Sequence, residues 1–170
     1  RSDYVTGPGA ISDEAVRRIM KDHGLGAWNV YAALYGTQEQ VDLHWKMVTR
    51  AFGKTGKARI FTEEDRKGDP IFSYGSALMR GDMDLREFNL YNWRGGGGSL
   101  WFAPVSQARG SETLKQMELT KRILAKHGLD YNGEFIVGMR EMHHIVDMLF
   151  DKTDRAMTKA AHACFDELLT

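Results

Sequence analysis

The sequence predicts an α+β protein in which an antiparallel sheet is covered by helices on one face. Two observations carry this prediction. Apolar segments of strand length alternate with amphipathic helical segments, in the order β-α-β, loop, β-α-β-β-α, and the connection at residues 139–142 is too short to join parallel strands. The order repeats a split β-α-β unit, which is typical of a ferredoxin-like sandwich. A doubly wound parallel sheet is the alternative, and the short connection disfavours it.

The first half of the chain is predicted to hold a short helix and one β-α-β unit. Ser12 precedes two acidic residues and opens the short helix. Residues 27–35 (AWNVYAALY) resemble a strand, and a capping box at residues 37–40 starts a helix that ends near Gly53. Residues 58–62 then complete the unit as a strand.

A long polar loop and the second unit follow. Residues 63–84 are rich in glycine and polar residues and contain Asp69-Pro70, so we interpret them as a loop, and long loops are often functional. The remaining elements are predicted from periodicity and caps: a strand at 99–105, a helix from Ser111 to Gly128, strands at 133–140 and 143–151, and a final helix after Asp154.

Composition excludes several classes of function. Lys plus Arg number 23 and Asp plus Glu also number 23, so no excess charge favours nucleic acid or an anionic membrane. The single cysteine, Cys164, allows neither an internal disulfide nor a thiolate metal cluster. Apolar runs are far shorter than the ~20 residues of a membrane span, so we expect a soluble protein.

A glycine run at residues 95–99 (GGGGS) lies in the best candidate site. It could form a phosphate- or flavin-approach loop, a flexible turn or a linker, and it matches neither the Rossmann nor the P-loop spacing. Aromatic and acidic residues gather around it: Glu87, Phe88, Tyr91, Trp93, Trp101 and Phe102. A packed aromatic core is the simpler interpretation, but Glu87 and Tyr91 fall in a loop-like stretch where side chains can face a ligand.

A second group of ionisable residues lies on the predicted C-terminal hairpin. Adjacent His143 and His144 would point to opposite faces of a strand, which argues against a metal site. The same alternation places His143 and Asp147 on one face, beside Glu134 of the neighbouring strand. These groups either line a polar pocket or lie on a solvent-exposed face of the sheet.

Several motifs resemble the 4-cresol dehydrogenase group of the vanillyl-alcohol oxidase family. The run NLYNWRGGGGSLWFAPVS at 89–106 is followed by ARGSE at 108–112, HGLDY at 127–131 and EFIV at 134–137. The resemblance covers nearly the whole chain. It implies the cap, or substrate, domain of an FAD enzyme, as one domain over residues 1–170, with the FAD-binding domain and a C-terminal closing segment outside these residues.

The resemblance also implies roles for individual residues. Tyr91 would bond through its phenol oxygen to the 8-methyl carbon of FAD. In the alcohol-oxidase branch of the family a histidine makes this bond, and the present chain has no histidine between His44 and His127. Glu87, Glu134, His143 and Asp147 would be catalytic and Trp101 would line the substrate pocket. No metal is expected.

The implied reaction removes a hydride from a para-alkylphenol, and water then attacks the resulting quinone methide. Glu134 or Glu87, helped by His143 and Asp147, would position or deprotonate that water. The implied partners are a c-type cytochrome subunit that takes the electrons and a second flavoprotein subunit in a homodimer. The implied compartment is the periplasm, with the cytoplasm left open. The alternatives are a vanillyl-alcohol or eugenol-type oxidase that uses dioxygen, and a catalytically silent ferredoxin-like binding domain. The 170 residues alone are expected to be inactive.

Overall fold

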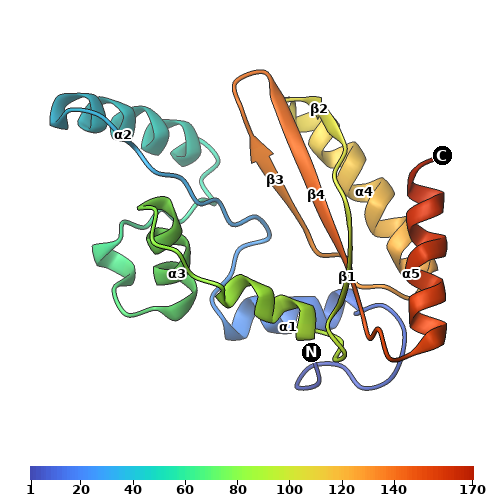
Figure 1. The fold of residues 1–170 in the computed structure, drawn as a ribbon. Coiled ribbons are helices and arrows are strands. Elements are labelled where there is room, and N and C mark those ends of the chain that lie inside the picture. The colour runs from blue at the N-terminus through green and yellow to red at the C-terminus, as the bar shows by residue number, and fades with distance from the viewer. The chain divides into compact units, whose positions relative to one another are not determined.

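The computed structural model describes all 170 residues, and the chain forms two compact units. Unit 1 comprises Arg1–Ala27 and Arg86–Thr170 and contains the whole sheet, whereas unit 2 comprises Trp28–Leu85 and contains helices but no strand (Figure 1). None of the helices combines the length and the apolar character that a bilayer crossing requires.

Strand β4 (Glu141–Phe150) is the central strand of the four-stranded antiparallel sheet in unit 1. Strand β3 (Gly133–Val137) pairs with one edge of β4. Strands β1 (Gly98–Phe102) and β2 (Val105–Gln107) share the other edge in a single register, because Phe102 lies opposite Val146 and Val105 opposite His143. They are therefore one extended strand with a short interruption, which Figure 1 shows as a continuous ribbon along β4.

Pro104 accounts for this interruption. Proline has no backbone N–H to donate to the ladder, so strand pairing is lost at residues 103–104. The Pro104 carbonyl still accepts a hydrogen bond from the His144 amide, at 3.0 Å. The register therefore continues on both sides of the proline.

The core lies between one face of the sheet and helices α4 (Gly110–Lys126) and α5 (Arg155–Leu168). Alternate residues of β4 face these helices and are almost fully buried: Met142, His144, Val146, Met148 and Phe150. Cys164 of α5 is also fully buried and belongs to this core. The opposite face, which carries the odd-numbered residues of β4, is called the open face below.

The predicted α+β class is confirmed, as are several helix starts. Ser12 caps helix α1 (Asp13–Asp22), the capping box of Thr37 and Gln40 opens helix α2 (Gln38–Gly53), and Asp154 caps α5. The second predicted β-α-β-β-α unit forms as β1/β2, α4, β3, β4 and α5.

Two strand predictions are wrong. Residues 27–35 and 58–62 have no regular secondary structure, so of the first predicted unit only the helix forms. A strand needs a partner to satisfy its backbone groups, and an apolar run does not reveal whether one is present.

The predicted loop at 63–84 is also largely wrong, because Asp69-Pro70 starts helix α3 (Pro70–Met79) and a 3₁₀ helix, η1 (Glu64–Arg66), precedes it. The Asp69 carboxylate accepts from the Ile71 and Phe72 amides, which is the geometry of an N-cap followed by proline.

Candidate active site

Four of the predicted site residues share the open face of the sheet. Glu134 of β3 lies opposite Ile145, and Trp101 of β1 lies opposite Asp147. Because side chains alternate along β4, His143, Ile145 and Asp147 point to the same side. Three strands thus bring together residues that are up to 46 positions apart in the sequence, from Trp101 to Asp147.

Asp147 is the most enclosed carboxylate of this group, with a relative exposure of 6%. Burial raises its pKa, and the negative charge of Glu87 raises it further. Hydrogen bonds from the Ser99 hydroxyl and from the Trp101 side chain act in the opposite direction and hold the carboxylate in place. Asp147 is therefore positioned by two side chains of β1, and it retains a proton more readily than an ordinary aspartate.

Glu134 shares this electrostatic environment. Desolvation of its carboxyl group raises its pKa, and the charges of Glu87 and Asp147 add to the effect. Glu87 thus acts on both Glu134 and Asp147 across the open face. The negative charges therefore make Glu134 and Asp147 hold a proton more readily than ordinary carboxyl groups, which suits a role in proton transfer.

Glu87 and Tyr91 lie on a short 3₁₀ helix, η2 (Arg86–Asn92), where the sequence predicted a loop. This helix contacts β1 and β4, and it brings Glu87 close enough to influence both Glu134 and Asp147. Tyr91 is half-buried, and its ring packs against Phe88 with the centroids 5.6 Å apart. The structure thus joins the two candidate groups that the sequence suggested separately.

The two adjacent histidines have different surroundings, as strand alternation predicts. His143 is exposed on the open face, near the end of β4 that pairs with β2. His144 points into the core, where it is fully buried. Only His143 is therefore available to the site.

The glycine run forms a tight turn between η2 and β1. Gly95, Gly96 and Gly97 have φ angles of 80°, 61° and 65°, which L-amino acids with side chains rarely adopt. At Gly96 a Cβ atom would also lie 1.8 Å from Oδ1 and 2.9 Å from Cα of Asp151. The glycines are thus required by backbone conformation and by the close approach of Asp151.

This turn offers a matched pair of substitutions. Gly97→Ala introduces only the conformational strain, because its Cβ would meet nothing nearer than 3.9 Å, and we expect a cost of about 1 kcal/mol. Gly96→Ala adds the clash with Asp151, and we expect it to cost roughly 3 kcal/mol. Thermal unfolding of the full-length variants measures both, and equal losses of stability would show that the contact with Asp151 is unimportant.

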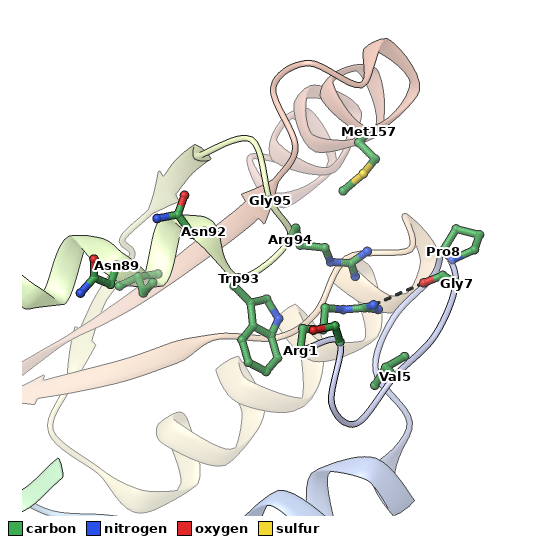
Figure 2. A pocket seen from close by; sticks show the side chains of 12 residues that line it. Arg1, Val5, Gly7, Pro8, Asn89, Asn92, Trp93, Arg94, Gly95 and Met157 are labelled. Carbon is green, nitrogen blue, oxygen red and sulfur yellow. Dashed lines mark hydrogen bonds between the residues drawn. The ribbon is translucent and has the colours of Figure 1, made fainter. Parts of the chain in front are cut away.

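A cavity of about 670 Å³ lies beside η2, and Gly95 at the start of the glycine turn is one of the residues that line it (Figure 2). The N-terminal segment (Arg1, Val5 and Pro8) forms one wall, and Asn89 and Trp93 form another. Sequence reasoning missed two groups that hold residues of the candidate site: Ser99, which donates to Asp147, and Asp130, which accepts from Trp93. Neither has a local sequence signal, because each pairs with a residue more than 30 positions away.

Comparison with known proteins identifies relatives along the whole chain, although no family model matches it. The chain is 57% identical over 169 residues to the flavoprotein subunit of 4-cresol dehydrogenase (hydroxylating) from Pseudomonas putida. The aligned region covers 99% of this chain and 32% of that protein. A crystal structure of p-cresol methylhydroxylase with substrate bound matches with a TM-score of 0.96 and 57% identity, over 99% of this chain and 33% of the other.

A 4-ethylphenol oxidase from Gulosibacter chungangensis, in complex with isoeugenol, matches with a TM-score of 0.93 and 36% identity, again over 99% of this chain and 33% of the other. The chain therefore spans about a third of the length of these relatives. Over that third, sequence and fold agree: the chain is similar throughout to the cap domain of the flavoprotein subunit of 4-cresol dehydrogenase.

Proposed function

We propose that the chain is the cap domain of an FAD-dependent oxidoreductase that oxidises and hydroxylates para-alkylphenols of the 4-cresol type. The observation that carries this proposal is 57% identity along the whole chain to a hydroxylating 4-cresol dehydrogenase. The open face supports it, because Glu87, Glu134 and Asp147 interact there beside Trp101. The FAD-binding domain and the C-terminal closing segment belong to the rest of the protein.

Tyr91 is the residue that would hold FAD covalently, through its phenol oxygen. It fits this role because it is half-buried on a short helix that lies against the sheet, four residues after Glu87. FAD bound there would accept a hydride from the benzylic carbon of the substrate. The chain's own contribution is to orient the reactants and to control the proton.

The open face would handle the water that completes the reaction. Loss of a hydride from the substrate phenolate leaves a quinone methide, and water adds to its benzylic carbon. That addition releases one proton, and the carboxylate of Glu134 or Glu87 receives it. Asp147, held by Ser99 and Trp101, supports the electrostatic field around this base, and His143 lies on the same face. The Trp101 ring, 53% exposed here, would form a wall of the pocket.

Glu134→Gln tests the role in water activation. We expect turnover to fall roughly 100-fold and the hydroxylated fraction of the product to fall with it, because the amide cannot accept the proton. In the unchanged enzyme, activity should fall as the pH drops through the raised pKa of Glu134, and the variant should lack this acidic limb. Product analysis and pH profiles of the full-length enzyme measure both. Glu118→Gln on the exposed face of α4 is the matched control, and unchanged turnover and product in Glu134→Gln would refute the role.

The electron acceptor in this proposal is a c-type cytochrome subunit, and the flavoprotein subunits form a homodimer in the periplasm. Similarity to the flavoprotein subunit of a dehydrogenase supports a separate partner subunit that takes the electrons. The alternative is an oxidase that uses dioxygen, and the match to a 4-ethylphenol oxidase at 36% identity is the observation that favours it. Oxygen uptake during turnover distinguishes them: a dehydrogenase consumes substrate with a cytochrome c acceptor and without stoichiometric oxygen.

The decisive experiment is acid denaturation of the full-length protein followed by mapping of any peptide that carries flavin. Flavin on the peptide that contains Tyr91 is the expected result. Flavin that is released, or that is attached to a histidine elsewhere, would refute the tyrosyl-flavin proposal and favour the oxidase. A full-length protein that binds no FAD at all would instead favour a silent binding domain.

A further inference from the structure

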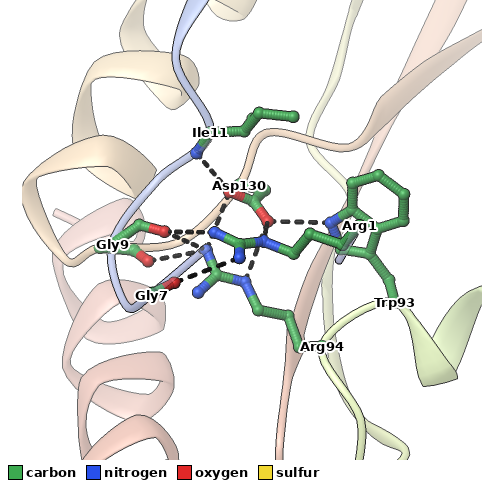
Figure 3. A network of polar contacts seen from close by, with 8 residues as sticks. Arg1, Gly7, Gly9, Ile11, Trp93, Arg94 and Asp130 are labelled. Carbon is green, nitrogen blue, oxygen red and sulfur yellow. Dashed lines mark hydrogen bonds and ion pairs between the residues drawn. The ribbon is translucent and has the colours of Figure 1, made fainter. Parts of the chain in front are cut away.

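Asp130 lies at the centre of a buried polar network in the connection between α4 and β3 (Figure 3). Its residue is 5% exposed. Its carboxylate accepts hydrogen bonds from Arg1 Nε at 2.8 Å, Trp93 Nε1 at 2.8 Å and Arg94 Nε at 2.9 Å, and also from the Ile11 amide. One carboxylate thus joins the N-terminal segment, the segment after η2 and the end of α4.

The cations of the network are as enclosed as the carboxylate. The side chains of Arg1 and Arg94 are 9% and 5% exposed. Arg94 also donates to the carbonyls of Gly9 and Gly128, both at 2.9 Å. Burial acts to raise the pKa of Asp130, but the hydrogen bonds from Arg1 and Trp93 and the charge of Arg94 outweigh it and lower the pKa. Asp130 is therefore ionised, and without it two buried guanidinium groups would lack their counter-charge.

The network is connected directly to the helix that carries Tyr91. Trp93 and Arg94 follow η2 without an intervening residue, and the Trp93 amide donates to the Leu90 carbonyl at 2.9 Å. A short 3₁₀ helix has weak internal hydrogen bonds, so its position depends on what its ends are attached to. On the C-terminal side of η2, that attachment is the pair of side chains bound to Asp130.

We infer that Asp130 is a positioning residue for flavin attachment: by binding Trp93 and Arg94 it fixes η2 and so sets where the Tyr91 phenol oxygen lies. This inference rests on the proposed function. In the attachment, the Tyr91 oxygen would form a bond to the 8-methyl carbon, while the tyrosine O–H and one methyl C–H would break and release two protons to solvent. The electron pair of that C–H bond leaves through the flavin to the enzyme's acceptor, an oxidised cytochrome or an added oxidant. Asp130 takes no part in these bonds and acts only on geometry.

The experiment measures attachment in full-length apoprotein made in riboflavin-depleted cells. FAD and ferricyanide are added, and acid-stable flavin is counted over time. We expect Asp130→Asn and the milder Trp93→Phe to slow attachment roughly tenfold or more, because a small displacement of a reacting atom has a large effect on rate. Glu167→Gln is the matched control: it removes the negative charge that pairs with Lys126 and His127 between α5 and the end of α4, and none of these three residues contacts Asp130, Trp93 or Arg94 through its side chain. It should leave the attachment rate unchanged.

Hydrogen exchange of the peptide at residues 86–97 is the second measurement. We expect faster exchange in Asp130→Asn and Trp93→Phe and no change in Glu167→Gln. A folded Asp130→Asn protein that attaches flavin at the wild-type rate would overturn the inference. If that variant does not fold, wild-type attachment in Trp93→Phe would overturn it instead. If the wild-type protein carries no flavin on Tyr91, the proposed attachment itself is refuted. In that case hydrogen exchange still tests the anchor: unchanged exchange at residues 86–97 in the variants would show that Asp130 does not fix η2.

Discussion

A full-length protein with Tyr91→Phe is expected to lose all of its flavin when it is denatured in acid. Phenylalanine keeps the ring that packs on Phe88 but has no oxygen with which to form the bond to FAD. Covalent flavin should therefore fall from full occupancy to none, while FAD that is bound without a covalent link can remain in the native protein. Absorbance of the acid-precipitated protein and mass analysis of its peptides measure the change.

Tyr35→Phe is the matched control for this result. Tyr35 is exposed in unit 2, and its hydroxyl donates to the Met79 carbonyl, so the substitution removes a phenol oxygen of similar chemistry far along the sequence from η2. It should retain acid-stable flavin. Acid-stable flavin in Tyr91→Phe would show that another residue makes the attachment, and Tyr91 would then be only a pocket aromatic.

Acidification is expected to weaken the sheet through His144. Its side chain is fully buried, bonds to the Tyr131 hydroxyl at 2.9 Å and stacks on Phe135 with the centroids 4.1 Å apart. Burial lowers its pKa from 6.5 to about 4. Its contribution to stability is therefore fully present above pH 6.5 and is lost as the pH falls toward 4, since the unfolded chain binds the proton more tightly. We expect a loss of about 2 kcal/mol at pH 5 and about 3 kcal/mol at pH 4.

Native-state hydrogen exchange of the β4 amides in the full-length protein measures this loss. The matched pair is His144→Phe and His143→Phe, which remove a buried and an exposed histidine at adjacent positions. Between pH 7 and pH 5, the opening free energy of β4 should fall in the wild type and in His143→Phe. It should fall less in His144→Phe, which has no group to protonate there. Protonation of Asp147 and Glu134, whose raised pKa values favour the folded state in acid, acts in the opposite direction in all three proteins. An identical pH dependence in the two variants would exclude His144 as the acid-sensitive group.

Local signals predicted the helix starts and the hairpin well. Caps such as Ser12, Thr37 and Asp154 act within three or four residues, so a sequence contains the whole interaction. The strands at residues 27–35 and 58–62 were predicted wrongly because strand formation depends on a partner elsewhere in the chain. Asp69-Pro70 was interpreted as part of a loop but starts helix α3, because an Asp-Pro pair is common both in turns and in the first turn of a helix.

The open face was predicted from alternation alone, because residues two apart on a strand must share a side. The contribution of η2 was predicted only as a stretch where side chains can face a ligand, and its electrostatic link to Glu134 and Asp147 needed the fold. Asp130 lies in the HGLDY motif at 127–131, but no role was predicted for it. Its partners are separated from it by 36 to 129 residues, and nothing near it in the sequence indicates a buried charge.

The central position of β4 also limits how this protein can diversify. Both edges of β4 are paired, and its residues contribute in turn to the core and to the open face. Removing or adding one residue would exchange the two sets: His144 and Val146 would be moved out to the open face, and Asp147 would be moved into the core. The chemistry of the open face can therefore change by replacement of side chains at alternate positions, whereas a change in the length of this strand would disrupt the core and the open face together.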